Sequence, residues 1–168
     1  KTVDADVRGS ESEHAALRRK QRNAASLPVK INDAANINET LPVLFPDQRD
    51  DVLFAEKRFF VDNKKGTLFT NGTGTGKTYT GLGIAKRFEQ RGKKRILIAV
   101  PTDAKAKDWI EDVVNVDLEI RQLSGIQDAG TNAVVTTYAN LRDNEAIVSE
   151  TWDLIIYDES HYLMSNKA

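Results

Sequence analysis

The stretch that decides the fold reads Asn71-Gly72-Thr73-Gly74-Thr75-Gly76-Lys77-Thr78. It follows the short apolar segment 67–70 and leads into a helix-like segment that begins near Lys77. A phosphate chain needs closely spaced backbone N–H donors, a cation for the outer phosphates and a hydroxyl group for Mg²⁺. The glycines supply the first because they carry no Cβ, Lys77 supplies the second, and Thr78 supplies the third. The stretch therefore predicts a phosphate-binding loop between a strand and a helix.

The loop departs in one position from the pattern G-x-x-x-x-G-K-[ST], since Asn71 stands where that pattern has its first glycine. Asn tolerates positive φ better than most residues, so the turn can still form. The alternative is a glycine-rich turn with an incidental lysine. We expect ATP to be bound by the backbone of the loop residues Gly72, Thr73, Gly74, Thr75 and Gly76.

From about Leu41 onward, short apolar runs alternate with helix-like segments. The candidate strands are residues 67–70, 95–100, 118–123, 133–136 and 154–157. The candidate helices are residues 48–60, 77–91, 104–114 and 138–148. Residues 96–100 and 154–157 are apolar at every position, as in strands buried on both faces. This alternation predicts an α/β domain in three layers, with a mostly parallel sheet covered by helices.

Two acidic residues follow the last apolar run, which leads directly into Asp158-Glu159-Ser160-His161. Phosphoryl transfer needs a carboxylate to hold Mg²⁺ and a second group to orient or deprotonate the attacking water. Ligands bind at the carboxyl end of a parallel sheet, so adjacent acids at that end can do both. We predict that Asp158 holds the metal together with Thr78 and that Glu159 polarises the nucleophile. The alternative for the acids alone is a solvated strand end.

His161 lies too far along the chain to share the role of Asp158. We expect it to sense the γ-phosphate or to link the site to a neighbouring element. The alternative is an ordinary surface histidine.

The bulk composition restricts the function classes. Lys and Arg total 24 against 25 Asp and Glu, which argues against a uniformly basic, DNA-coating protein. The absence of cysteine excludes disulfides and fits the reducing interior of a cell. No apolar run approaches the roughly 18 residues that span a bilayer. These features predict a soluble intracellular protein without a membrane partner, and both ends of the chain read as limits within a longer protein.

The first forty residues differ in composition from the rest of the chain. Residues 1–40 are polar and carry a helix-favouring segment over 11–25 with few large apolar side chains. This composition predicts a partly helical or disordered arm that is solvated, or else one that binds nucleic acid or a partner. Residues 41–168 form the predicted ATP-binding domain.

The lysine loop and the acid motif together resemble helicase superfamily 2, in particular its DExH branch. Motif I of that family is similar to residues 74–78, and its motif II is similar to residues 158–161. The segment 134–138 resembles motif Ib of Swi/Snf-type translocases and restriction-enzyme motor subunits. The resemblance implies a first RecA-like domain, C-terminally truncated, that hydrolyses ATP with Mg²⁺ when nucleic acid is present.

The resemblance also implies further contacts. Leu44-Phe45-Pro46-Asp47-Gln48 resembles the entry to the family's domain, in which Gln48 reads the adenine edge. Sequence-independent contacts to a nucleic-acid backbone, with DNA favoured, fall on Pro101, Thr102, Thr136 and Thr137. Trp109 falls at helical spacing with Ile110 and Val113, which favours packing over base stacking.

Motif III and a second RecA-like domain with its arginine finger are implied to follow Ala168. The chain alone is therefore expected to be weakly active or inactive. Two other function classes remain open: a P-loop enzyme that phosphorylates a small molecule, and a nucleotide-gated scaffold whose N-terminal arm engages a partner. A phosphorylated small product would indicate the first. Loss of a partner on removal of the residues before Asn38 would indicate the second.

Overall fold

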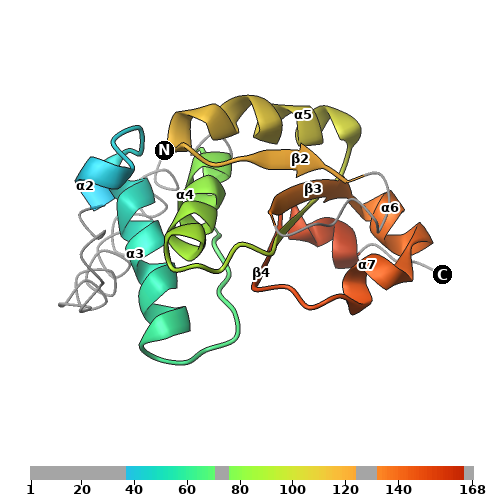
Figure 1. Cartoon of the computed structure of the whole chain (residues 1–168), viewed down its shortest axis with the longest axis horizontal. Helices are drawn as coiled ribbons and strands as arrows, with labels where there is room; N and C mark the ends of the chain where they lie inside the picture. The colour runs from blue at the N-terminus through green and yellow to red at the C-terminus, as the bar shows by residue number, and fades with distance from the viewer. Residues whose placement is uncertain (1–36, 71–75, 124–131, 165–168) are drawn as a thin grey trace, which may run out of the picture.

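The computed structural model describes residues 37–70, 76–123 and 132–164 of the chain, which form a layered α/β domain (Figure 1). The helices are α2 (Ile37–Thr40), α3 (Pro46–Phe60), α4 (Lys77–Gln90), α5 (Asp103–Asp112), α6 (Tyr138–Asp143) and α7 (Glu145–Ser149). The strands are β1 (Ile96–Val100), β2 (Ile120–Gln122), β3 (Ala133–Thr137) and β4 (Leu154–Tyr157). Two short 3-10 helices complete the described part, η1 (Val113–Val116) after α5 and η3 (Ser160–Met164) after β4.

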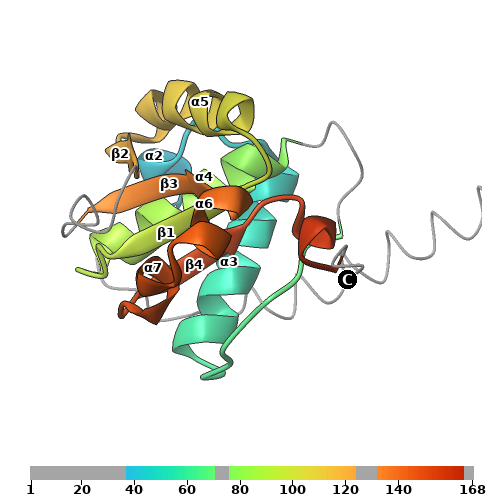
Figure 2. The ribbon, with the colours of Figure 1, turned by 90° about the vertical axis from the view of Figure 1, so that its right-hand side faces the viewer.

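The four strands form one parallel sheet in the order β2-β3-β1-β4, as Figure 2 shows. The register sets Val100 opposite Thr137 and Ala99 opposite Tyr157. Because all strands run in one direction, their carboxyl ends meet at one edge of the sheet. Residues 101, 137 and 158 therefore follow or end their strands along this same edge.

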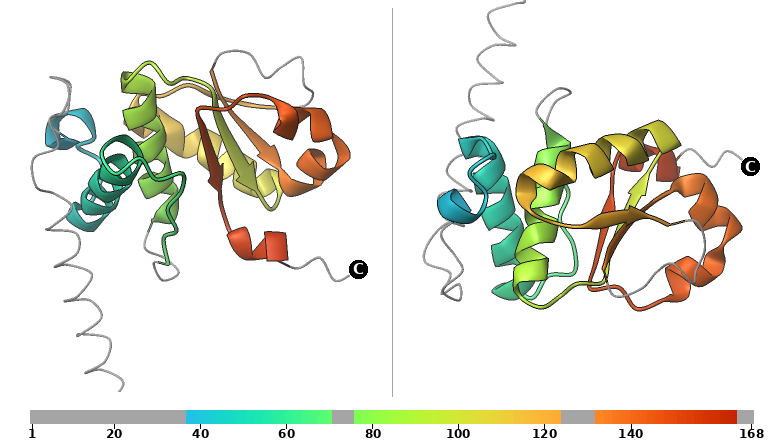
Figure 3. Two further views of the ribbon diagram at one scale, coloured as in Figure 1. Left: turned by 90° about the horizontal axis from the view of Figure 1, so that it is seen from below. Right: turned by 45° about the horizontal axis from the view of Figure 1, so that its top comes forward.

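Alternate residues of β1 belong to two different hydrophobic clusters, one on each face of the sheet. Ile96, Ile98 and Val100 join the cluster that contains α3, α4 and α5. Leu97 and Ala99 join the cluster that contains α6 and α7. Figure 3 shows the sheet between these two groups of helices. The three-layer parallel α/β fold predicted from the sequence is confirmed.

Helix α4 is the main support of the first face. Its side chains Leu82, Ala85 and Phe88 are buried in the hydrophobic cluster on this face. Gly83 faces α3, and a Cβ added there would lie 2.7 Å from a methyl carbon of Val52. The glycine therefore allows α4 and α3 to pack closely.

A buried ionic cluster joins α3 to the end of α4. Glu56 is 2% exposed and accepts hydrogen bonds from Nε and Nη2 of Arg87, at 3.1 and 3.0 Å, with Arg87 itself 3% exposed. Arg91 also donates to Glu56, and its guanidinium lies over the ring of Phe60. A carboxylate buried this deeply is tolerated because both of its oxygens accept charge-assisted hydrogen bonds.

Two predicted elements differ from the structure. No strand forms over residues 67–70, where Phe69 packs edge-on against Phe54 of α3 and Leu68 is 72% exposed. An apolar run predicts that a segment is partly buried, but a strand forms only where its backbone also pairs with a neighbouring strand. The helix predicted over 138–148 is interrupted at Asn144, whose backbone (φ −131°, ψ 71°) is not helical, and forms α6 and α7.

The core begins before the predicted domain boundary. Ile37 in α2 and Leu41 after it are both buried in the cluster under α3 and α4. Residues 1–36 of the predicted arm lie outside the described residues. In the ranges that the structure describes, no helix combines the length and the apolar character needed to cross a bilayer.

Candidate functional site

Gly76 leads into α4 in the left-handed conformation, with φ 69° and ψ 41°. Its carbonyl accepts the first hydrogen bonds of the helix, from the N–H groups of Tyr79 and Thr80. Among the described residues no side chain caps this N-terminus, and its first turn carries no acidic residue. The N–H groups of the first turn and the helix dipole therefore favour an anion beside Lys77 and Thr78. The predicted loop residues Gly72, Thr73, Gly74 and Thr75 lie outside the described residues.

Gln48 joins the start of α3 to the end of the loop. Its side chain is buried; Oε1 accepts from the backbone N–H of Phe45 at 2.9 Å, and Nε2 donates to the carbonyl of Gly76 at 3.3 Å. A Cβ at position 76 would collide with the same Nε2 atom. Gln48 thus caps its own helix and fixes the backbone where the loop ends, while adenine readout by Gln48 remains a prediction.

Asp158 lies at the carboxyl edge of the sheet, directly after β4. Its backbone N–H donates to the carbonyl of Ala99 at 2.9 Å, and its carbonyl accepts from the hydroxyl of Tyr138 at 2.7 Å. Burial of Tyr138 raises the pKa of its phenol, and the nearby charges of Asp158 and Glu159 raise it further. Tyr138 therefore stays a protonated donor at neutral pH and holds the Asp158 backbone in place.

Trp109 connects Asp158 to α4. The indole is 1% exposed, which confirms the predicted packing role, and its Nε1 donates to Oδ2 of Asp158 at 3.0 Å. The opposite end of the ring contacts Gly81, one turn after Lys77. Helix α4 also packs against β4. The structure therefore places the first turns of α4 and the Asp158 carboxylate on the two sides of one indole ring.

Glu159 has an unusual backbone for a residue other than glycine, with φ 54°. Such a conformation costs about 1–3 kcal/mol and recurs at functional sites. The turn exposes the Glu159 side chain, and one of its oxygens lies 3.4 Å from Nδ1 of His161. His161 is itself largely exposed, on η3 beside Tyr162. Glu159 and His161 are thus neighbours at the surface, next to the more enclosed Asp158.

The four predicted nucleic-acid contacts divide into two groups. Thr102 is exposed and caps α5, accepting from the N–H of Lys105, and Thr137 caps α6 in the same way from Asn140. Pro101 is partly exposed beside Thr102.

Thr136 differs from the other three because it is 1% exposed. Its hydroxyl donates to the carbonyl of Leu123 at 3.5 Å and accepts from Asn140 at 2.7 Å. The side chain of Thr136 therefore faces the interior, where its hydroxyl group is hydrogen-bonded to these neighbours, and it cannot reach an external phosphate.

The side chains fit a metal that is held mainly by its nucleotide. Within the described ranges, no three carboxylate or histidine side chains gather into a metal-binding cluster. Mg²⁺ bound with a nucleotide characteristically takes one or two protein oxygens and completes its shell with phosphate and water. The hydroxyl of Thr78 and the carboxylate of Asp158 are suitable oxygens. In the described part of the chain, Oδ1 of Asp158 has no hydrogen-bond donor.

Comparison with known proteins identifies the family. Residues 16–168 match the family model described as type III restriction enzyme, res subunit. The chain belongs to this family. The res subunit domain is a superfamily 2 helicase RecA-like domain, in agreement with the resemblance seen in the two motifs. The match assigns this chain to the helicase-like ATPase motor domains. Among curated proteins, none matches the chain.

Sequence reasoning missed the contact from Trp109 to Asp158. Its one available signal was Gly81, since a glycine inside a helix costs about 1 kcal/mol relative to alanine and therefore suggests a close neighbour. The identity of that neighbour depends on how α5 lies over α4. The hydrogen bonds of Gln48 and Tyr138 likewise required the fold.

Proposed function

We propose that this chain is the ATP-binding half of a motor that translocates on double-stranded DNA. The observation that carries the proposal is the position of the Trp109 indole, which lies against Gly81 near the start of α4 and donates to the Asp158 carboxylate at the carboxyl edge of the sheet. The family membership of the chain supports the same function.

In this proposal the nucleotide lies against the first turn of α4. The ammonium group of Lys77 pairs with the outer phosphates, and the backbone of residues 72–76 surrounds the triphosphate. Thr78 and Asp158 hold Mg²⁺, which neutralises charge on the β- and γ-phosphates. Gln48 reads the adenine, and it also steadies the loop through Gly76.

Glu159 orients and polarises the attacking water. Its exposed carboxylate follows directly after Asp158, at a turn in which the backbone of Glu159 has φ 54°. His161 lies beside Glu159 and senses the γ-phosphate. A second RecA-like domain completes the site with an arginine, whose absence can cost a factor on the order of a thousand or more in rate.

In this proposal the starts of helices α5 and α6 contact the DNA backbone. Thr102 and Thr137 are N-caps at the same sheet edge, next to N–H groups that suit phosphate oxygens. With Pro101 beside Thr102, they form a surface for sequence-independent backbone binding. The overall charge is close to neutral, so this binding depends on local contacts.

The test is the ATPase rate of the full-length protein at low salt, alone and with duplex DNA, single-stranded DNA or RNA. We expect duplex DNA to stimulate hydrolysis most. Lys77→Ala should weaken ATP binding and abolish turnover, whereas Glu159→Gln should keep ATP and stop hydrolysis. Absence of stimulation by any polymer would contradict a nucleic-acid motor. Equal residual turnover in the two variants would contradict the assigned roles.

A further inference from the structure

The Trp109 indole occupies a site that is built for it. The ring is buried between α4 and β4, and its Cη2 atom lies 2.5 Å from where a Cβ of residue 81 would be. Only glycine at that position lets the ring lie this close to the helix. The pocket therefore fixes the ring plane, and with it the direction of the Nε1–H bond.

That bond is directed at one oxygen of Asp158. The indole N–H is a donor only and cannot exchange roles with its partner. The 3.0 Å hydrogen bond to Oδ2 orients the carboxylate, while Oδ1 accepts no hydrogen bond from the described residues and can bind another ligand. The backbone of Asp158 is held separately, by Ala99 on one side and Tyr138 on the other. Side chain and backbone are thus restrained by independent contacts.

We propose that Trp109 is a positioning residue for Mg²⁺, acting through Asp158. This inference rests on the proposed function, because it assumes that Asp158 contributes to holding the metal. A donor that fixes one carboxylate oxygen presents the other in a constant direction. Partners of this kind typically change metal affinity or activity by about 10- to 100-fold when removed.

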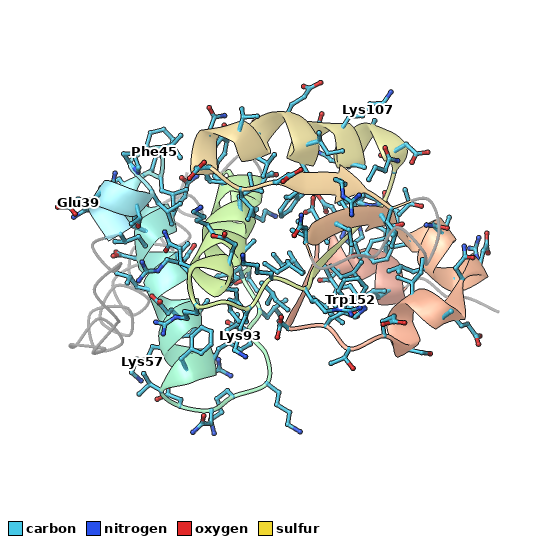
Figure 4. The ribbon with its side chains drawn as sticks, in the orientation of Figure 1. Glu39, Phe45, Lys57, Lys93, Lys107 and Trp152 are labelled. Carbon is cyan, nitrogen blue, oxygen red and sulfur yellow. The ribbon has the colours of Figure 1, made fainter. Side chains whose placement is uncertain are left out.

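The matched control is the second tryptophan of the chain. Trp152 also donates its indole N–H within the protein, to the carbonyl of Ile147 at 2.8 Å, and it packs in the cluster of α6 and α7 (Figure 4). Trp109→Phe and Trp152→Phe therefore remove the same chemical group and keep a six-membered aromatic ring. Only the first removes a contact to Asp158.

The experiment measures the affinity for ATP by calorimetry, once with Mg²⁺ and once with EDTA. The dissociation constant in EDTA divided by the dissociation constant in Mg²⁺ isolates the contribution of the metal. We expect Trp109→Phe to reduce this ratio by about tenfold, while Trp152→Phe keeps the wild-type ratio. A folded Trp109→Phe protein with the wild-type ratio would overturn the inference. If wild-type protein does not bind ATP, the proposed function fails instead.

A spectroscopic measurement keeps the inference testable should Trp109→Phe not fold. In the Trp152→Phe protein, fluorescence comes from Trp109 as the one remaining tryptophan of the two. Its emission should change when ATP binds with Mg²⁺ and change less when ATP binds in EDTA. Emission that responds equally in both conditions would contradict a link between the indole and the metal.

Discussion

Gly81 lies directly against the indole of Trp109, at a distance that leaves no room for a methyl group. Gly83, two residues further along α4, is similarly close to Val52 of α3. The two glycines therefore permit contacts to two different helices. Only the first of these contacts leads on to Asp158, through the Trp109 side chain.

Replacing each glycine by alanine should separate packing from function. Helix propensity favours alanine by about 1 kcal/mol, but overpacking costs about 1–3 kcal/mol, so both variants should lose stability against denaturant. Gly81→Ala should also weaken ATP binding in the presence of Mg²⁺, whereas Gly83→Ala should not. Equal effects of the two variants on the Mg²⁺-dependent affinity would contradict a specific link between α4 and Asp158.

Gln48→Ala should weaken the binding of ATP and GTP together, because the contact to Gly76 that steadies the loop is lost. The affinity for ATP should fall further than the affinity for GTP, because Gln48 is proposed to read the adenine. Gln122→Ala is a suitable control, since that side chain donates to Asp103 at the surface, away from Gly76. Parallel losses for the two nucleotides, measured by calorimetry, would restrict Gln48 to its role in the loop.

Glu56→Ala should be among the most destabilising substitutions in the domain. It removes the buried carboxylate that pairs with the guanidinium of Arg87, and breaking a buried ion pair typically costs about 3–5 kcal/mol of the free energy of unfolding. Glu89→Ala removes a partner of Lys86 at a more exposed site and should cost about 1 kcal/mol or less. Denaturant unfolding of both variants measures the difference. A small loss in Glu56→Ala would show that Arg87 finds another partner.

The raised pKa of Tyr138 predicts a loss of stability at high pH. The unfolded chain ionises this phenol near the ordinary value of 10.0, whereas burial keeps it protonated in the folded protein. The stabilisation is therefore complete below pH 10 and is lost as the pH rises above that value. The wild-type protein should lose stability relative to Tyr138→Phe over this range. Parallel pH profiles would contradict the raised pKa of the buried Tyr138 phenol.

Much of the fold was accessible from residue patterns. The fully apolar runs at 96–100 and 154–157 predicted strands buried on both faces. Both runs are strands, side by side in the sheet, and β1 is fully buried. In contrast, β4 stands at the end of the described strand order and is only partly buried. The segment 67–70 is short and partly apolar as well, yet it has no strand partner in the described part of the chain. Local pattern shows that a segment is buried on one side, and the neighbour that pairs with it depends on the whole topology.

The candidate site was predictable only in part for the same reason. Lys77, Thr78 and Asp158 were predicted because their chemistry is carried by local motifs. The burial of Thr136 was missed. The sequence does not show whether a hydroxyl group at a strand end faces solvent or a side chain such as that of Asn140. Trp109 was recognised as a packing residue, but its hydrogen bond joins positions 49 residues apart.

The central claim is that Lys77 and Asp158 act on one Mg²⁺-bound nucleotide. It is tested most directly by a double-mutant cycle of ATP affinity with wild-type protein, Lys77→Ala, Asp158→Ala and the double variant. Groups that share a ligand should give losses that do not add, and the loss in Asp158→Ala should disappear in EDTA. Additive losses, or a loss in Asp158→Ala that does not depend on Mg²⁺, would contradict a shared site.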